Sequence, residues 1–409
     1  MKFTRVFAFM ALAGLATTAH ATNGMFSHGY GMKAKGMAGA ATTNTEDTFF
    51  GANNPAAAAF VGNRIDLGMD LFSPRREATM GNWFGPGMDA TVDSDSNYFL
   101  VPEFGYNRMI NSNLALGVTV YGNGGMNTDY GAVPGSGGAN FFGNPGSLGV
   151  DLMQLIIAPT AAYKIAPDHS IGISPLLGYQ RFAAEGLGGP TEDYDSAFGH
   201  GVRVGYLGKI TPTVTIGAAY SSKVNFEKLD KYNWLFLGQG DLDLAENYNL
   251  GMSWQATPAL KLALDYQRIN YTSVDSIGKS ASEGGFGWDD MDVWKLGMEY
   301  KYTPKLTLRA GYSHASSPIE GANMAQCMVG SPNCGEVTLN ILAPGVIEDH
   351  ITLGFTYTLA SGNELTMAYM HGFENKVSGQ GFDNLGNPRG IDTIQMYQNA
   401  IGIQYSWKM

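Results

Sequence analysis

Outside residues 1–21, the 409-residue sequence lacks an uninterrupted apolar run of the roughly 18 residues that a membrane-spanning helix requires. Charged residues are scarce as well, at 15% of the chain, whereas Gly (55), Tyr (21) and Phe (21) are abundant. The net charge of −11 excludes the basic surface that nucleic acid would need. This composition favours many short strands and excludes a helical membrane protein.

Signatures of catalysis and cofactor binding are also missing. The 7 His residues are scattered without metal-ligand spacing, and neither a Gly-x-Ser-x-Gly elbow nor a Gly-x-x-x-x-Gly-Lys loop occurs. Asp93, Asp95 and Asn97 resemble the start of a calcium loop, but Tyr98 stands where that loop needs glycine. We therefore predict no enzyme, no cofactor and no metal site.

Cysteine is nearly absent too. The chain has 2 cysteines, Cys327 and Cys334, in a segment rich in Gly, Pro and Asn. The nearest histidine, His314, is too distant along the chain for a compact metal site. In an oxidising compartment two such cysteines readily pair, so we predict a disulfide that closes a small loop.

Residues 1–21 have the three parts of a secretory signal peptide. Lys2 and Arg5 give a positive start, residues 6–16 form an apolar run, and Ala19-His20-Ala21 is a small-x-small cleavage site. We expect export and cleavage near Ala21, with a buried N-terminal helix as the alternative.

From residue 61 to residue 409 the sequence repeats one pattern of about ten alternating residues per segment. In the first segment Ile65 and Leu67 fall on one face, and Asp66 and Asp70 on the other. Because strand side chains alternate between faces, apolar residues can meet lipid while charges point inward. Tyr or Trp recurs at the segment ends, where membrane interfaces favour these rings.

Short turns and long loops separate these segments in strict alternation. Six short turns lie near residues 111–113, 166–168, 211–212, 257–258, 303–304 and 361–363, and seven long loops near 73–96, 125–149, 183–197, 224–240, 271–290, 313–346 and 373–392. This count predicts an all-β fold: a 14-stranded antiparallel transmembrane β-barrel with both ends in the periplasm.

Residues 22–60 break the alternation. They are rich in Gly, Ala, Asn and Met, and they include Phe26, Phe49 and Phe50, which gain by burial. A barrel of fourteen strands is wide enough to hold such a segment. We predict that residues 22–60 form a plug inside the barrel.

The chain resembles the FadL-type family of outer-membrane transporters for long-chain fatty acids and related hydrophobic compounds. The resemblance covers the mature chain, and its specific motifs lie in the first third: Asn23-Gly24-Met25-Phe26, residues 29–40, Asp47, Asn54-Pro55-Ala56, Val101-Pro102, residues 120–125, Met153-Gln154, Ala158-Pro159 and Tyr163. It implies a fourteen-stranded barrel whose N-terminal hatch holds the ligand beside it. It also implies release through a side opening near a kinked third strand.

Asn54-Pro55-Ala56 stands where the chain leaves the plug for the first strand. Pro55 lacks an N–H and fixes φ, so it marks a boundary in any case. The motif is either a simple hinge or, as the resemblance implies, part of the hatch together with Phe26 and Asp47.

Gly122, Gly124 and Gly125 close the third strand. Glycine there permits a kink or bulge and removes side chains from the wall. An ordinary strand-to-loop transition and a side opening both fit these residues.

Two strands carry apolar residues on both faces. Phe99 and Val101 point inward on the second strand, as do Leu152 and Ile156 on the fourth. A water-filled porin should be polar at every inward position. Part of the lumen is therefore predicted to be dry, because these residues pack on the plug or because they line a ligand pocket.

These observations predict passive uptake of hydrophobic molecules, most of all long-chain fatty acids, by a monomer in the bacterial outer membrane. The expected partners are an apolar ligand, outer-membrane lipid and lipopolysaccharide. A general diffusion porin, an uptake channel for aromatic or alkane hydrocarbons, and an outer-membrane hydrolase are the alternatives, and the last would need a convergent catalytic site.

Overall fold

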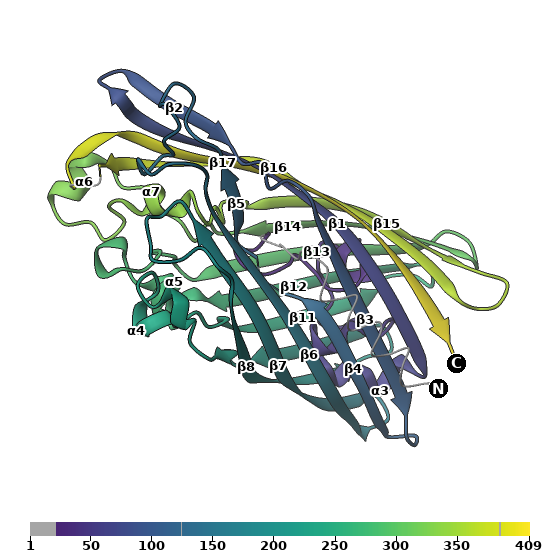
Figure 1. Cartoon of the computed structure of the whole chain (residues 1–409). Coiled ribbons are helices and arrows are strands. Elements are labelled where there is room, and N and C mark those ends of the chain that lie inside the picture. Colours follow the sequence, from purple (N-terminus) through teal and green to yellow (C-terminus); the bar gives the residue numbers. More distant parts are fainter. Residues whose placement is uncertain (1–21, 124, 384–385) are drawn as a thin grey trace.

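The computed structural model describes residues 22–123, 125–383 and 386–409. The predicted signal peptide therefore lies outside the described residues. The dominant feature of the structure is one antiparallel sheet rolled into a barrel (Figure 1). Among the described residues fourteen strands form the wall: β1 (Arg64–Gly85), β3 (Phe99–Met109), β4 (Leu114–Gly122), β6 (Leu148–Ala166), β7 (His169–Glu185), β8 (Asp195–Lys209), β9 (Val214–Ser221), β11 (Glu246–Gln255), β12 (Leu260–Asn270), β13 (Met291–Lys301), β14 (Leu306–Ala315), β15 (Asp349–Thr358), β16 (Glu364–Phe382) and β17 (Pro388–Lys408).

The barrel closes between its first and last strands. β1 pairs with β17 from Arg64 opposite Lys408 to Thr79 opposite Thr393. This pairing leaves neither β1 nor β17 with a free edge over these residues, and free edges are costly in lipid because their backbone groups are unpaired. The predicted all-β fold with fourteen antiparallel wall strands is confirmed.

Short turns join the strands at one end of the barrel. At three of them a Thr-Pro pair makes the turn, because the threonine hydroxyl accepts from the backbone N–H three residues later. This distance is 3.0 Å for Thr211 to Val214, for Thr257 to Leu260 and for Thr303 to Leu306. The chain thus reverses in few residues, which fixes the register of each following strand.

The opposite end carries the long connections and most of the small elements (Figure 1). They are β2 (Met88–Asp93), β5 (Asn127–Tyr130), β10 (Asn225–Phe226), η3 (Asp230–Tyr232), α4 (Leu237–Gly240), η4 (Tyr271–Ser273), α5 (Asp275–Gly278), η5 (Ala281–Glu283), α6 (Met324–Met328) and α7 (Glu336–Asn340). Two predicted loops, 73–96 and 373–392, are largely strand instead. There β1 continues to Gly85, and β16 and β17 run on as a protruding hairpin.

The two faces of the wall differ as the alternation predicts. Met69 and Leu71 of β1 are exposed on the outer face, whereas Asp66 and Asp70 are buried on the inner face. In the part of the chain that the structure describes, no helix is both long and apolar enough to cross a membrane.

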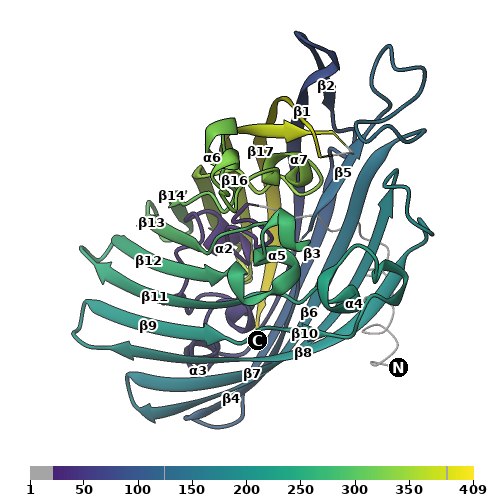
Figure 2. The ribbon, with the colours of Figure 1, turned by 90° about the vertical axis from the view of Figure 1, so that its left-hand side faces the viewer.

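The N-terminal segment lies inside the barrel, in the purple part of the ribbon (Figure 2). It contains α2 (Met32–Lys35), η1 (Phe49–Gly51), η2 (Pro55–Ala57) and α3 (Ala58–Val61), and nearly all its residues are buried. We call residues 22–61 the hatch. It enters β1 at the end of the barrel that holds the short turns, next to the C-terminus (Figure 1).

Candidate functional site

The side chain of Asn54 forms hydrogen bonds both within the hatch and between the hatch and the wall. Its side-chain amide donates to the carbonyl of Thr42 in the hatch and to that of Tyr206 in β8, both at 2.9 Å. Its side-chain oxygen accepts from the N–H of Ala56 at 3.1 Å, which caps the short helix that begins at Pro55. The carbonyl of Ala56 then accepts from the hydroxyl of Ser170 in β7 at 2.8 Å. The motif is thus anchored to two wall strands.

Glycines surround the hatch on the inner face of the wall. At Gly205 an added Cβ would lie less than 3.0 Å from Asn54 and Pro55. The hatch therefore approaches the wall backbone at Gly205 more closely than a side chain at that wall position would allow. Among the described residues, the same clash with hatch atoms occurs at Gly105, Gly117, Gly172, Gly217, Gly251, Gly297, Gly311 and Gly402. We call these nine residues the glycine ring.

Buried ion pairs complete the attachment. Lys35 of α2 contacts Asp70 of β1 at 2.8 Å and Glu103 of β3 at 3.1 Å, and all three side chains are buried. On the other side of the lumen Arg309 of β14 contacts Glu46 of the hatch at 3.0 Å. Such pairs favour one position of the hatch, because a displaced hatch would leave buried charges unpaired.

Asp47 in the hatch and two inward-facing cations of the wall, Arg203 and Lys295, also form hydrogen bonds that hold the hatch backbone. The Asp47 carboxylate accepts from the N–H of Phe49 at 3.2 Å and so orders the turn before η1. Arg203 donates to the carbonyls of Ala52 and Asn53, and Lys295 donates to the carbonyl of His28 at 3.3 Å.

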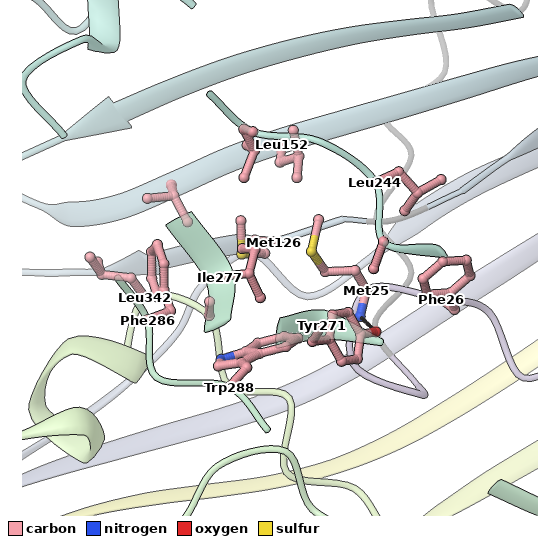
Figure 3. Close-up of a cluster of buried hydrophobic side chains, with 14 of the residues drawn as sticks. Met25, Phe26, Met126, Leu152, Leu244, Tyr271, Ile277, Phe286, Trp288 and Leu342 are labelled. Carbon is pink, nitrogen blue, oxygen red and sulfur yellow. Dashed lines mark hydrogen bonds between the residues drawn. The ribbon is translucent and has the colours of Figure 1, made fainter. Parts of the chain in front are cut away.

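Above the hatch lies an apolar interior, which Figure 3 shows in close-up. Met25 and Phe26 project from the hatch into it, and Tyr271 and Trp288 enter from the long loops. The Tyr271 and Trp288 rings pack edge to face at 4.9 Å. This interior is built jointly by hatch, wall and loops.

The four predicted pocket residues are all buried and face inward, but they do not meet in one place. Leu152 and Ile156 belong to the apolar interior. Phe99 lies in a smaller cluster with Phe72, Met370 and Ala400. Val101 is buried as well, but it belongs to neither of these two clusters. Apolar residues on two strands thus indicated a dry lumen without showing which of them share a pocket.

The wall is incomplete between β3 and β4. Their ladder ends at Phe104 opposite Val120, although β3 continues to Phe99. The next hydrogen-bonding position would set Pro102 opposite Gly122, and Pro102 has no N–H to donate. Beyond that point β3 pairs only with β1 among the described wall strands.

The third strand is also displaced at this gap. Gly122 of β4 is opposite Leu155 of β6, and Asn127 of β5 is opposite Asp151 of β6. Between these two pairs the chain advances by five residues from β4 to β5, but by only four residues along β6. One extra residue of this kind is a β-bulge, which bends a strand. Of the predicted opening residues, Gly122 ends β4 and Gly125 follows within the bulge, while Gly124 lies outside the described residues.

Hollows lie on both sides of this bulge. An inner cavity of about 20 Å³ is lined by Gly125, Met126, Asn127 and Trp288, among others. An outer depression of about 510 Å³ is lined by Asn127 and by Phe99 of β3. Asn127 borders both, so the segment 125–127 separates the interior from the outer surface.

Arg76 of β1 faces the inner cavity and was missed by the sequence reasoning. Its buried guanidinium donates to the carbonyls of Ser96 and Asn127, which lie on opposite sides of the gap. Among the described residues, no Asp or Glu forms an ion pair with it. The missed signal was the inward series Phe72, Pro74, Arg76 and Ala78, which continues the alternation of β1 into the predicted loop.

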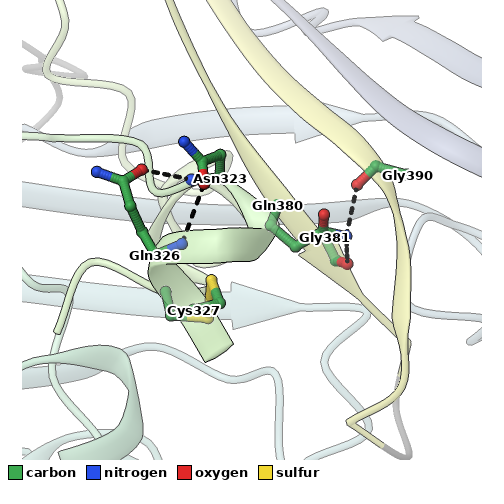
Figure 4. Close-up of a disulfide and its surroundings, with 7 residues drawn as sticks. Asn323, Gln326, Cys327, Gln380, Gly381 and Gly390 are labelled. Atoms are coloured by element: carbon green, nitrogen blue, oxygen red, sulfur yellow. Dashed lines mark hydrogen bonds between the residues drawn. A yellow bond between two sulfur atoms is a disulfide. The ribbon is translucent and has the colours of Figure 1, made fainter. Parts of the chain in front are cut away.

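Cys327 and Cys334 form a disulfide in the loop that carries α6 and α7 (Figure 4). Their Cα atoms are 5.3 Å apart, an ordinary separation for a disulfide. Asn323 caps α6 beside the bridge by accepting from the N–H of Gln326 at 3.0 Å. The bridge is remote from the hatch and acts on a loop.

Residues 12–328 match the family described as outer membrane protein transport protein (OMPP1/FadL/TodX). The chain belongs to this family of bacterial outer-membrane proteins. No curated protein matches the sequence.

Solved structures share the fold. A FadL homologue from Pseudomonas aeruginosa is 16% identical, with a TM-score of 0.70 over 94% of this chain and 99% of that one. The toluene transporter TodX from P. putida is 17% identical, with a TM-score of 0.66 over 93% and 99%. The toluene transporter TbuX from Ralstonia pickettii is 17% identical, with a TM-score of 0.65 over the same shares.

Proposed function

We propose that this protein carries hydrophobic small molecules inward across the outer membrane without an energy source. The supporting observation is an apolar interior that lies beside the gap between β3 and β4. Below it the hatch packs closely on wall strands around the barrel. A lipid-like molecule gains by entering an apolar site from water. The anchored hatch blocks the direct way into the periplasm, so the ligand leaves sideways through the wall. One closed barrel supplies all of these residues, which favours a monomer.

The preferred substrate is a long-chain fatty acid, and Arg76 carries this part of the proposal. A carboxylate needs a cationic partner in a dry site, and a guanidinium can bind it through two parallel hydrogen bonds. Arg76 lines the inner cavity together with apolar residues and has no acidic partner among the described residues. The other inward cations named above hold the hatch.

Binding of a carboxylate at Arg76 would also act on the gap. The guanidinium now bridges Ser96 and Asn127, and a carboxylate would compete with those two carbonyls. The inner cavity, at about 20 Å³, is far smaller than a fatty acid, so the interior must open as the ligand enters. Ligand arrival and loosening of the gap would then be one event.

Fatty-acid binding to purified variants tests this assignment. Arg76→Ala should weaken binding of a pyrene-labelled fatty acid by about 10- to 100-fold, the effect of losing charge-assisted hydrogen bonds. Arg75→Ala is the matched control, because the Arg75 side chain bonds the exposed Tyr98 hydroxyl. Binding of uncharged toluene should be the same in both variants.

Two outcomes would redirect the proposal. Equal fatty-acid affinity in the Arg76 and Arg75 variants, with tight toluene binding, would favour an aromatic hydrocarbon channel. The Tyr271 and Trp288 rings would suit that ligand. Large steady ion conductance without binding of either ligand would instead indicate a general diffusion porin.

A further inference from the structure

An apolar groove runs across the outer surface of β4, β6, β7, β8, β9 and β11. It measures about 800 Å³, and its lining is almost entirely apolar. Several of its lining residues are exposed on the lipid-facing side of the wall, among them Tyr163, Ile173, Val204, Tyr220 and Leu250. The groove therefore faces the membrane rather than the lumen.

Two rows of outward-facing residues form the sides of the groove. Within each row, every residue is directly opposite the next one in a ladder. The lower row, which is nearer the short turns, contains Leu114, Tyr163, Ile171, Tyr206, Ala218 and Leu250. The upper row contains Ala161, Ile173, Val204, Tyr220 and Tyr248. Ala161 lies beside Tyr163 on the outer face of β6, and Ala218 lies beside Tyr220 on that of β9. This difference in side-chain size gives the groove its depth.

The hatch fixes the floor of the groove from the other side of the wall. The floor is the backbone between the two rows, at Ala162, Gly172, Gly205 and Ala219. Gly172 and Gly205 belong to the glycine ring, so the hatch segment at Asn54 and Pro55 packs directly on their inner side. Asn54 also donates to the carbonyl of Tyr206 in the lower row. The groove is therefore held in shape before a ligand arrives, and a preformed site binds without the cost of ordering.

The upper row continues beyond the groove toward the short turns. Ala161 is opposite Leu116, and Leu116 is opposite Arg108 of β3. Arg108 is exposed on the same face of the wall as Leu116, close to the short turn at residues 111–113. Among the described residues Arg108 forms no ion pair. A charged side chain on the lipid face is costly unless it reaches the head groups, so this position calls for an anionic group at the membrane surface.

The opposite end of the upper row is acidic. Tyr248 is opposite Arg268 in the ladder of β11 and β12. The guanidinium of Arg268 is already paired with Asp290 at 3.0 Å and with Asp292 at 2.7 Å. Glu246 begins β11 on the same face as Tyr248 and adds a further carboxylate. An anionic lipid is therefore favoured with its head group at the other end, where the cation lacks a carboxylate partner in the part of the chain that the structure describes.

A phospholipid of the periplasmic leaflet has the chemistry that both features require. Its acyl chain is apolar and flexible, so it can fill a groove that crosses several strands. Its phosphate lies at the membrane surface on the side of the short turns, and a guanidinium binds phosphate through two parallel hydrogen bonds. Lipopolysaccharide carries its phosphates in the opposite leaflet and would meet the acidic end of the row instead.

We infer that the groove binds a phospholipid of the periplasmic leaflet, with an acyl chain between the two rows and the phosphate on Arg108. The inference does not depend on the proposed function, because neither the apolar interior nor Arg76 takes part. The bound chain covers the outer side of the backbone on which Asn54 and Pro55 pack. At Gly172 and Gly205 the wall is only a backbone thick, and the lipid closes it from outside.

Native mass spectrometry of the protein purified from outer membranes is the test, with dioleoyl phosphatidylglycerol added in mild detergent. Wild type should bind this lipid, and Arg108→Ala should weaken its binding by about 10-fold, as expected for the loss of charge-assisted hydrogen bonds. Lys305→Ala is the matched control, because Lys305 is exposed in a short turn between β13 and β14, away from the groove. Dioleoylglycerol has the same chains without a phosphate, so its binding should be equal in wild type and in both variants.

A second pair of variants tests the groove itself. Ala218→Phe fills the groove between Tyr206 and Leu250, so it should weaken binding of both lipids. Ala310→Phe is the matched control, because Ala310 is an outward residue of β14 between Met298 and Leu353, outside the groove. We expect Ala310→Phe to bind both lipids as wild type does.

Three results would overturn the inference. The first is equal affinity for phosphatidylglycerol in wild type, Arg108→Ala and Ala218→Phe. The second is weaker binding in Arg108→Ala with unchanged binding in Ala218→Phe, because the lipid would then lie outside the groove. The third is a dimer that Ala218→Phe dissociates, because a second copy of the chain would then occupy the groove.

Discussion

The hydroxyl of Tyr271 lies 2.7 Å from the backbone nitrogen of Met25 and 2.6 Å from the carbonyl oxygen of Asn23. It accepts a hydrogen bond from the first and donates one to the second. A long loop at the outer end of the barrel thereby holds the N-terminal tip of the hatch. The position of Met25 and Phe26 in the apolar interior depends on this loop contact.

Tyr271→Phe should release the tip without emptying the interior. The ring stays, but two buried backbone groups lose their partner, at a cost of about 1–3 kcal/mol to the local structure. We expect faster hydrogen exchange at Met25 and Phe26, measured by mass spectrometry in detergent micelles. Tyr232→Phe is the control, since its hydroxyl bonds Ala184 and Asp193, away from the hatch. Unchanged exchange at Met25 would refute the contact.

The glycine ring makes the fit of the hatch testable at single positions. Gly205→Ala places a methyl group against Asn54, and overpacking of this kind destabilises by about 1–3 kcal/mol. We expect a lower urea midpoint for the refolded protein in lipid vesicles. Gly131→Ala should be neutral, because an added Cβ at Gly131 meets nothing within 4 Å. Equal midpoints for the two variants would show that the hatch yields at Gly205.

Strand faces and turns were predictable because they depend on local chemistry. Alternation placed Asp66 and Asp70 inward, and the Thr-Pro pairs marked the reversals. Asn54-Pro55-Ala56 was recognised as a boundary, although its partners, Tyr206 and Ser170, come from strands far along the chain.

What depends on register was not predictable. Pro159 and Pro175 are ordinary strand residues in the sequence, and only the pairing of β6 with β7 sets them opposite each other. The glycines in the wall gave no sign of which would touch the hatch. Arg76 was assigned to a loop because β1 runs beyond the length that a membrane strand needs.

Glu336 makes the stability of the loop between β14 and β15 sensitive to pH. This loop covers the apolar interior, and we call it the loop cover. Burial, with Asp289 and Glu320 nearby, raises the pKa of Glu336 to about 8. The folded loop thus binds a proton that the unfolded loop releases near its ordinary pKa, so stability falls as the pH rises from there to about 8. Glu336 belongs to α7, whose Asn340 accepts from the Trp288 indole at 2.6 Å.

Raising the pH from 6 to 9 should therefore loosen the cover over the apolar interior. We expect faster hydrogen exchange around Leu342 and Trp288 at the higher pH, after correction for the intrinsic rate. Glu336→Gln should remove this pH dependence, because the amide stays neutral. Glu374→Gln, at an exposed position of β16, should retain it. A pH response that survives Glu336→Gln would assign it to another group.

Lys35 tests whether the buried charges fix the hatch in place. Lys35→Met leaves Asp70 and Glu103 buried without their cation, and removing one partner of such a cluster costs about 3–5 kcal/mol. We expect a large drop in the urea midpoint and a rise in ion conductance, since a displaced hatch opens the lumen. The triple variant K35M/D70N/E103Q removes the unpaired charge and should recover most of the stability. Low conductance in Lys35→Met would mean that the glycine ring and Asn54 hold the hatch without this cluster. Recovery of the closed state in the triple variant would instead show that the charge balance of these three residues matters more than the ion pairs themselves.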